Sequence, residues 1–165
     1  MKREKVLGVD FGGVISDRVA DNSDTSFFAG RFLETPMVDG AMDALFRLVN
    51  GPFEGRVHVI SKAGPKIQER TRLWMNHHQF TDRTGISEAN VHFCRERRDK
   101  APICKRLAVT HFVDDRLDVL GYLETVPVKL LFCARIGDTR DHPAPLPTGI
   151  TRVIGWAEAE AALTS

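Results

Sequence analysis

The stretch that decides the fold is VLGVDFGG, residues 6–13. An apolar run long enough for one buried strand ends in the carboxylate of Asp10 and enters a glycine turn. A second apolar run, around Phe112, ends in the adjacent carboxylates of Asp114 and Asp115. Because a buried carboxylate without a partner carries a large desolvation cost, two such strand ends indicate one shared cation at the edge of a sheet.

Strand and helix patterns alternate along the rest of the chain. The predicted strands cover residues 6–9, 56–61, 91–93, 110–113 and 128–134, with an edge strand near 152–154. The predicted helices cover residues 39–49, 65–78, 99–109 and 156–163, the first of them capped by Asp39. This alternation predicts an α/β fold, a doubly wound, mostly parallel sheet of five to six strands with helices on both faces. In such sheets ligands bind beyond the carboxyl ends of the strands.

The composition is that of one soluble globular domain spanning residues 1–165, with 42% hydrophobic and 27% charged residues. The net charge of +1 gives no strong nucleic-acid signal and no footprint for an anionic membrane. No apolar run approaches the roughly 20 residues that span a bilayer. Only a strand-length apolar run follows the basic start, which predicts no signal peptide. Cys94, Cys104 and Cys133 lack metal-ligand spacing and are expected to be buried, reduced thiols of a cytoplasmic protein.

Residues 17–36 are polar except for an aromatic cluster that includes Phe27, Phe28 and Phe32. From the residues alone, this segment is expected to form a short helical excursion. The family resemblance given below implies that it is a small cap or lid, with the aromatic residues serving either as the lid itself or as its packing face. In that family a cap this small leaves the site open, which suits a bulky substrate, or closure by a second copy of the chain in a homodimer.

The candidate site residues are carboxylates at strand ends. Asp10 faces a turn rich in backbone amides, which hold phosphate oxygens, and its carboxylate can act as a nucleophile or a metal ligand. The alternative is an ordinary turn aspartate. Asp114 and Asp115 repel each other unless a cation or a hydrogen-bond network holds them, and Mg²⁺ prefers such a carboxylate pair. The alternative is an acidic loop neutralised by Arg116.

Two further polar residues lie at the ends of predicted elements. Ser61 ends its strand, where its hydroxyl can donate to a phosphate oxygen; the alternative is a helix-capping or loop serine. Lys100 opens the helix before the Asp114 strand. A lysine there neutralises both a carboxylate nucleophile and a phosphate, whereas the alternative is a solvated surface lysine.

Taken in order, these four elements resemble the haloacid dehalogenase superfamily of Mg²⁺-dependent phosphohydrolases, over roughly residues 5–135. Within it the chain looks most like the 5'(3')-deoxyribonucleotidase-like branch, because of Arg98-Asp99-Lys100 and the later stretch FVDDRLD, residues 112–118. The resemblance implies a Rossmann-like fold with a minimal cap. It also implies hydrolysis of a phosphomonoester, with a nucleotide as the first substrate class to test.

The resemblance also implies roles for the individual residues. Asp10 would attack phosphorus and carry an aspartyl-phosphate. Mg²⁺ would be held by Asp10, the carbonyl oxygen of Gly12 and Asp115, with Asp114 helping directly or through water.

The remaining implied roles concern the phosphoryl group. Ser61, Lys62 and Gly13 would bind it, and Lys100 would steady Asp10 and the transferring charge.

The chain departs from the family pattern at Gly12. Family phosphatases usually carry a second aspartate there, which protonates the leaving group, and such general acid catalysis is worth about 10²–10⁴-fold. Ser16 or Asp17 could take over this role. The glycine keeps open a second function, that of a catalytically weakened phosphate- and metal-binding or regulatory protein. A third, dehalogenase chemistry at carbon, is disfavoured by the Asp114-Asp115 pair, because displacement at carbon needs no Mg²⁺.

Overall fold

The computed structural model describes residues 3–17, 31–134 and 145–165. Its strands are β1 (Leu7–Val9), β2 (Val57–Lys62), β3 (Val91–Cys94), β4 (His111–Asp114), β5 (Val128–Cys133) and β6 (Ile150–Ile154). Its α-helices are α1 (Ala41–Val49), α2 (Pro65–His77), α3 (Phe80–Thr84), α4 (Lys100–Leu107), α5 (Leu117–Tyr122) and α6 (Gly155–Thr164). Three short 3-10 turns complete it: η2 (Phe32–Glu34), η3 (Glu88–Asn90) and η4 (Arg97–Asp99).

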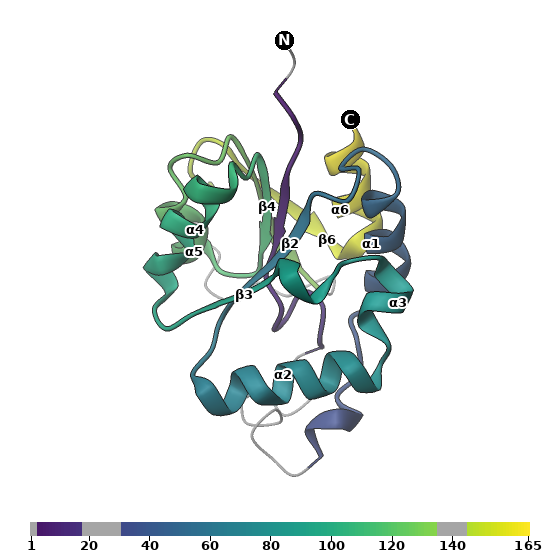
Figure 1. Cartoon of the computed structure of the whole chain (residues 1–165). Helices are drawn as coiled ribbons and strands as arrows, with labels where there is room; N and C mark the ends of the chain where they lie inside the picture. Colours follow the sequence, from purple (N-terminus) through teal and green to yellow (C-terminus); the bar gives the residue numbers. More distant parts are fainter. Residues whose placement is uncertain (1–2, 18–30, 135–144) are drawn as a thin grey trace.

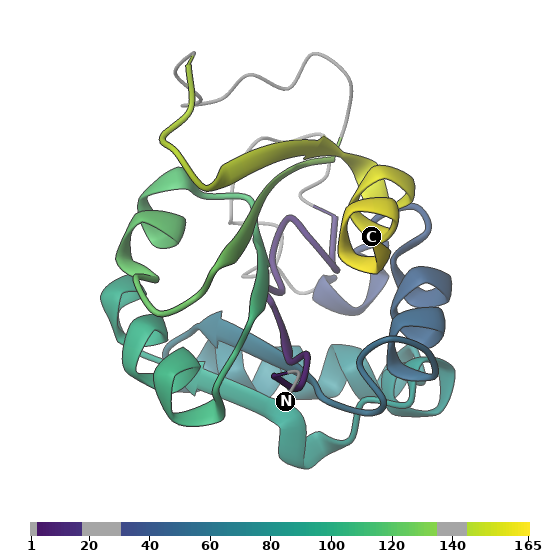
Figure 2. The same cartoon turned by 90° about the horizontal axis from the view of Figure 1, so that it is seen from above.

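The strands form one sheet in the order β3-β2-β1-β4-β5-β6, and every neighbouring pair is parallel. Strand order therefore reverses at β1, which has β2 on one side and β4 on the other. Helices α4 and α5 cover one face, and α1, α3 and α6 lie on the other (Figures 1 and 2). The predicted doubly wound parallel sheet is confirmed.

The sheet separates two apolar cores. Leu7 and Val9 of β1 point into the larger core with Leu45 of α1. Ile60 of β2 and Phe112 of β4 point into the smaller core beneath α4 and α5. Gly8 is needed on this side, because a Cβ atom there would lie 2.5 Å from the Phe112 ring. Alternation along β1 thus brings Asp10 to the α4 face, the face on which the charged site forms.

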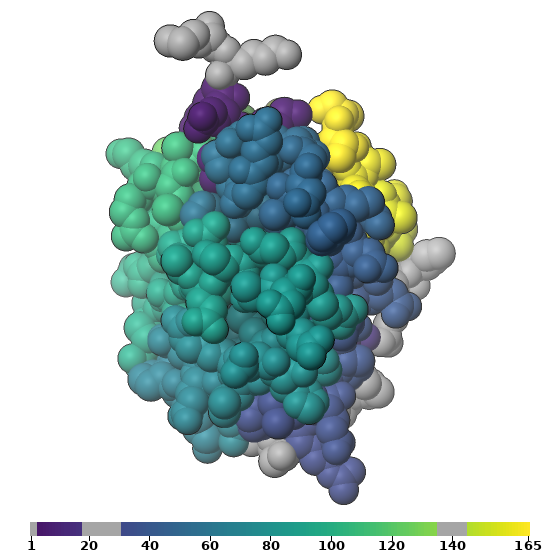
Figure 3. Space-filling model, turned by 45° about the vertical axis from the view of Figure 1, so that its right-hand side comes forward, coloured from purple at the N-terminus to yellow at the C-terminus, as the bar shows by residue number. Residues whose placement is uncertain are grey.

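Helix α2 runs below the carboxyl ends of the strands, and with α1 and α3 it forms one continuous side of the molecule (Figures 1 and 3). Its start at Pro65 is typical of a first helical residue. Trp74 of α2 is fully buried, and its indole N–H donates to the carbonyl oxygen of Thr35 at 2.8 Å. Phe11, which directly follows Asp10, packs edge-on against the Trp74 ring, with ring centroids 5.2 Å apart. The helix therefore fixes the turn from below.

The element boundaries differ from the predictions in two ways. Asp39 does not cap α1; Gly40 precedes the helix in a left-handed conformation, with φ of 78°, and no side chain caps the first turn. The short helices α3 and α5 were not predicted, because five or six residues are too few to show a helical period. The edge strand near residues 152–154 is confirmed as β6.

Most of the predicted cap, including Phe27 and Phe28, lies outside the described residues. Phe32 lies beneath the guanidinium of Arg70, 5.1 Å from it. The cap remains a prediction. The three cysteines are buried and form no disulfide. No helix in the described ranges is long and apolar enough to cross a membrane.

Candidate active site

The predicted polar strand ends do converge at the switch point. Asp10 directly follows β1, and its N–H donates to the carbonyl oxygen of Val113 in β4 at 3.0 Å, which extends the sheet by one residue. Asp114 is the last residue of β4, and Ser61 is the last but one of β2. All three side chains are buried. The sequence reading of Ser61 as a loop or capping serine is therefore wrong.

Lys100 holds the two strand ends together. Its Nζ donates to Oδ1 of Asp10 and to Oδ2 of Asp114, each at 2.9 Å. Lys100 begins α4 and is 2% exposed, so it is not a solvated surface lysine. The second oxygen of Asp114 accepts the backbone N–H of Arg116 at 2.9 Å. Both oxygens of Asp114 are thus engaged, whereas Lys100 takes only Oδ1 of Asp10.

The cluster is held in its charged form by mutual attraction. Burial alone would lower the pKa of Lys100, but the carboxylates of Asp10 and Asp114 outweigh it and raise that pKa above its ordinary value. Burial, followed by the like charge of Asp10, raises the pKa of Asp114, and Lys100 opposes this shift. One ammonium between two carboxylates therefore satisfies Asp114 only in part.

The same place offers a set of oxygen ligands for a cation. Asp10, Asp114 and Asp115 each present a carboxylate oxygen within 4.8 Å of the others. Three carboxylates and one lysine carry a net charge of −2 among themselves, which a divalent cation would neutralise. Hard oxygen donors of this kind suit Mg²⁺. The residues present fit the predicted metal, with Asp10 and Asp115 better placed than Asp114, whose oxygens already have partners.

The loop after β4 is braced through Asp118. The guanidinium of Arg116 contacts both oxygens of Asp118, at 3.1 and 3.2 Å, and Arg97 of η4 lies 3.9 Å from the same carboxylate. Asp118 also accepts the N–H of Val119. The hydrogen bond to Asp118 raises the pKa of Arg116, and the charges of Asp115 and Asp114 add to this shift. The alternative in which Arg116 neutralises the acidic pair stays open, with Asp118 as the direct side-chain partner of Arg116.

The turn after Asp10, residues 11–16, is closed by backbone hydrogen bonds. The carbonyl oxygen of Phe11 accepts from Ile15 at 2.8 Å and Ser16 at 3.1 Å, and the N–H of Gly13 donates to the carbonyl oxygen of Ser16 at 2.9 Å. Gly13 adopts a φ of 84°, which favours glycine. Its predicted phosphate contact stays a prediction, and would require this internal hydrogen bond to be shared.

Gly12 is the half-buried residue of the turn, and a Cβ atom added there would meet nothing within 4 Å. Packing therefore does not impose a glycine at position 12. Ser16 is 4% exposed and pairs with Met37, so its hydroxyl belongs to the interior of the turn.

Sequence reasoning missed two features. It gave Lys100 a role toward Asp10, yet did not foresee its equal contact with Asp114. A signal for this was present, because residues 10 and 114 end strands that the switch-point rule places side by side.

The second missed feature is a half-buried histidine pair. His58 Nδ1 of β2 lies 3.0 Å from His92 Nε2 of β3. The alternation of side chains along the two predicted strands places both histidines on the α4 side of the sheet. Whether they lie opposite each other depends on strand register, which cannot be read from one sequence.

Among the comparisons with known proteins, the one with solved structures finds similar molecules. Scans against protein-family models and curated proteins find no match. Among solved structures, a D,D-heptose 1,7-bisphosphate phosphatase from B. bronchiseptica, complexed with magnesium and phosphate, is similar with a TM-score of 0.71 and 16% identity, over 97% of this chain and 98% of that one. The corresponding enzyme from Burkholderia thailandensis gives 0.66 and 18%, over 98% and 99%.

A haloacid dehalogenase-like hydrolase from Burkholderia xenovorans LB400 is also similar, with a TM-score of 0.63 and 13% identity, over 99% of this chain and all of that one. The chain has the haloacid dehalogenase-like fold. At such identities the likeness shows the fold and no more. The nucleotidase-like branch finds no support among these structures and stays a prediction.

Proposed function

We propose that the protein is a Mg²⁺-dependent phosphohydrolase in which Asp10 is the nucleophile. The observation that carries this is the buried triad of Asp10, Lys100 and Asp114, joined by two hydrogen bonds of 2.9 Å at the switch point of the sheet. Burying three charged side chains is expensive. A fold keeps such an arrangement most readily where the charges act on a ligand.

Different residues are proposed to act on phosphorus and on the phosphoryl oxygens. Asp10 offers Oδ2 to phosphorus while Lys100 holds Oδ1 by a hydrogen bond of 2.9 Å, which orients the carboxylate. Ser61 and Lys62, at the end of β2, would bind the phosphoryl oxygens. Mg²⁺, held by Asp10, Asp115 and the carbonyl oxygen of Gly12, would neutralise charge on the phosphate. Asp114 positions Lys100.

The similar structures support this proposal. A phosphatase complexed with magnesium and phosphate shares the fold over nearly the whole chain. The substrate class predicted from the sequence is a phosphomonoester, either of a phosphorylated small molecule or of a nucleotide. A cytoplasmic location and a homodimer remain predictions from the sequence.

Hydrolysis of p-nitrophenyl phosphate with and without Mg²⁺ tests the proposal. Asp10→Asn should lower kcat by more than about 10³-fold, because the amide cannot attack phosphorus. The matched control is Asp43→Asn on the exposed side of α1, which should leave the rate unchanged. Unimpaired turnover by Asp10→Asn would refute the proposed nucleophile.

A second function is favoured by Gly12, which supplies no proton. In that case the chain binds Mg²⁺ and phosphate without turning over any phosphoester. Calorimetric titration with Mg²⁺ and a phosphate analogue such as beryllofluoride, together with a panel of phosphoesters, separates the two functions. Binding without turnover favours the regulatory protein, and turnover of any panel member favours the enzyme.

A further inference from the structure

Position 12, where the family pattern places the general acid, carries no side chain, and the space around it is open in the part of the chain that the structure describes. Ser16, one of the two residues considered as a substitute, is buried with its backbone tied into the turn. A substrate whose leaving group must be protonated would therefore react about 10²–10⁴-fold more slowly than with a general acid present.

Leaving groups differ widely in their need for a proton. An alkoxide is about as basic as hydroxide, whose conjugate acid has a pKa of about 15.7. A phenolate has a conjugate acid of pKa about 10. A phosphate departs as an anion whose conjugate acid has a pKa of about 6, so at neutral pH it leaves without help. The acid-free site thus suits a phosphoanhydride far better than an alkyl ester.

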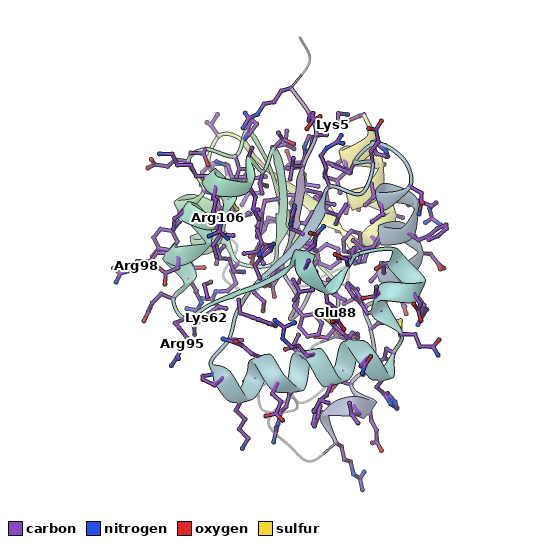
Figure 4. All side chains as sticks on the ribbon, in the orientation of Figure 1. Lys5, Lys62, Glu88, Arg95, Arg98 and Arg106 are labelled. Atoms are coloured by element: carbon purple, nitrogen blue, oxygen red, sulfur yellow. The ribbon has the colours of Figure 1, made fainter. Side chains whose placement is uncertain are left out.

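Basic side chains lie at the same edge of the sheet. Lys62 ends β2, Arg95 follows β3, and Arg98 lies in η4; all three are exposed. The register pairs Lys62 with Cys94, which places Lys62 beside the start of the Arg95 segment. Figure 4 shows Lys62 and Arg95 at the lower left of the molecule and Arg98 above them at its left edge.

Lys62 also lies on the side of the sheet that carries Asp10. Val9 pairs with Val59, so Lys62 is one strand across and two residues beyond the partner of Asp10. Strand spacing puts the two Cα atoms about 8 Å apart, within reach of a lysine side chain. Burial raises the pKa of the Cys94 thiol, and the charges of Lys100, Asp99, Asp10 and Lys62 also act on it.

The charge near this edge is only partly balanced. Arg97 faces Asp118, and the nearby acids in sequence are Glu96 and Asp99. Lys62, Arg95 and Arg98 outnumber these two acids by one. An anionic leaving group would be attracted here, and a neutral alcohol would gain nothing.

We infer that the scissile bond is a phosphoanhydride, whose departing phosphate is received by Arg95 and Arg98, beside the Lys62 that binds the phosphoryl group. This rests on the proposed function and gives it as substrate a compound with a terminal phosphate on another phosphate, such as pyrophosphate or a nucleoside diphosphate, in place of the simple phosphomonoester predicted from the sequence. Asp10 attacks the terminal phosphorus, its carboxylate oxygen bonds to that atom, and the P–O bond to the bridging oxygen breaks. The electron pair stays on the departing phosphate. Water then displaces the Asp10 carboxylate from phosphorus and releases inorganic phosphate and a proton.

A series of leaving groups tests the inference. The probes are inorganic pyrophosphate, acetyl phosphate, p-nitrophenyl phosphate and glycerol phosphate, each assayed with Mg²⁺. We expect kcat/KM for pyrophosphate to exceed that for glycerol phosphate by at least about 10²-fold. Similar values for the two substrates would overturn the inference while leaving the phosphohydrolase intact. No hydrolysis of any probe would refute the proposed function itself and the inference with it.

Gly12→Asp supplies the missing acid. It should reduce the ratio of pyrophosphate to glycerol phosphate turnover at least tenfold, because only the alkoxide gains from a proton. The matched control is Gly12→Asn, which has the same size and cannot protonate an alkoxide, and its ratio should stay as in the wild type. An equal change in both variants would assign the effect to shape and overturn the account of Gly12.

The double substitution Arg95→Ala with Arg98→Ala tests the basic edge. It should lower kcat/KM for pyrophosphate about tenfold and that for acetyl phosphate, whose leaving carboxylate carries a single charge, by less than threefold. The matched control is Arg106→Ala, an exposed arginine higher on α4 (Figure 4), which should change neither. Acetyl phosphate as the fastest substrate, with no effect of the double substitution on either probe, would overturn the phosphoanhydride in favour of an acyl phosphate.

Discussion

Two clusters of polar side chains on the α4 side of the sheet differ in how they carry charge. At the carboxyl edge, Lys100 lies between Asp10 and Asp114 and donates a hydrogen bond to each carboxylate. Further up, His58 and His92 share one hydrogen bond of 3.0 Å. Burial, with the neighbouring His92, lowers the pKa of His58 to about 4, so both rings are neutral at pH 7.

The two clusters differ in net charge, and this difference indicates which of them is suited to bind a ligand. The histidine pair avoids the desolvation cost by giving up its protons, and it contributes a neutral hydrogen bond. The carboxyl-edge cluster bears the cost and keeps a net negative charge, which makes sense only if a cation joins it. If only the stability of the fold mattered, neutral hydrogen-bonded side chains such as the histidine pair would be favoured at both positions.

The largest expected effect comes from Lys100→Met. This change leaves Asp10 and Asp114 buried without their cation, so the free energy of unfolding should fall by about 3–5 kcal/mol. Urea unfolding measures it. Lys105→Met, on the exposed side of the same helix, is the control and should stay within about 0.5 kcal/mol of the wild type. Equal stability of the two variants would mean that the cluster is not held by charge.

The histidine pair predicts a smaller, pH-dependent effect. The pKa of His58 is depressed from 6.5 to about 4, so the folded protein binds the proton more weakly than the unfolded chain. The stabilising contribution is complete above pH 6.5 and is lost as the pH falls toward 4. After allowing for partial exposure, the loss is about 1–2 kcal/mol.

Unfolding of His58→Gln between pH 7 and 4.5 tests this effect. The variant should lose less stability over that range than the wild type does. His77→Gln, at an exposed position on α2, is the control and should follow the wild type. Parallel curves for the wild type and His58→Gln would show that the pair does not stay neutral.

The smallest effect concerns Asp115. Without divalent cations, Asp115→Asn should raise the free energy of unfolding by about 1 kcal/mol, because it relieves repulsion among three carboxylates whose oxygens lie within 4.8 Å of one another. Mg²⁺ should raise the Tm of the wild type and leave that of the variant unchanged. Asp118→Asn, at the loop brace outside the cluster, should keep the Mg²⁺ response. Stabilisation of Asp115→Asn by Mg²⁺ would remove Asp115 from the ligand set.

Much of this fold could be predicted from the sequence because its strong signals are local. Buried parallel strands appear as short apolar runs, and the longer helices have clear starts, such as Pro65. The approach of Asp10 to Asp114 followed from strand order alone. Lys100 needed the resemblance, since nothing local separates it from an exposed lysine.

What could not be predicted depends on tertiary register and on short elements. The His58–His92 contact exists because β2 and β3 pair with a particular offset, which no single strand encodes. Asp39 looked like a helix cap, but the chain reaches α1 through the left-handed Gly40. The open space around position 12 was also invisible, although the absence of an acid there was plain.

Covalent capture of the nucleophile tests the central claim most directly. The protein is mixed with p-nitrophenyl phosphate or pyrophosphate and Mg²⁺, quenched in acid, reduced with borohydride and mapped by mass spectrometry. We predict a phosphorylation-dependent modification at Asp10 that is absent from Asp10→Asn. Turnover without any modification of Asp10, or modification at another residue that persists in Asp10→Asn, would contradict the account.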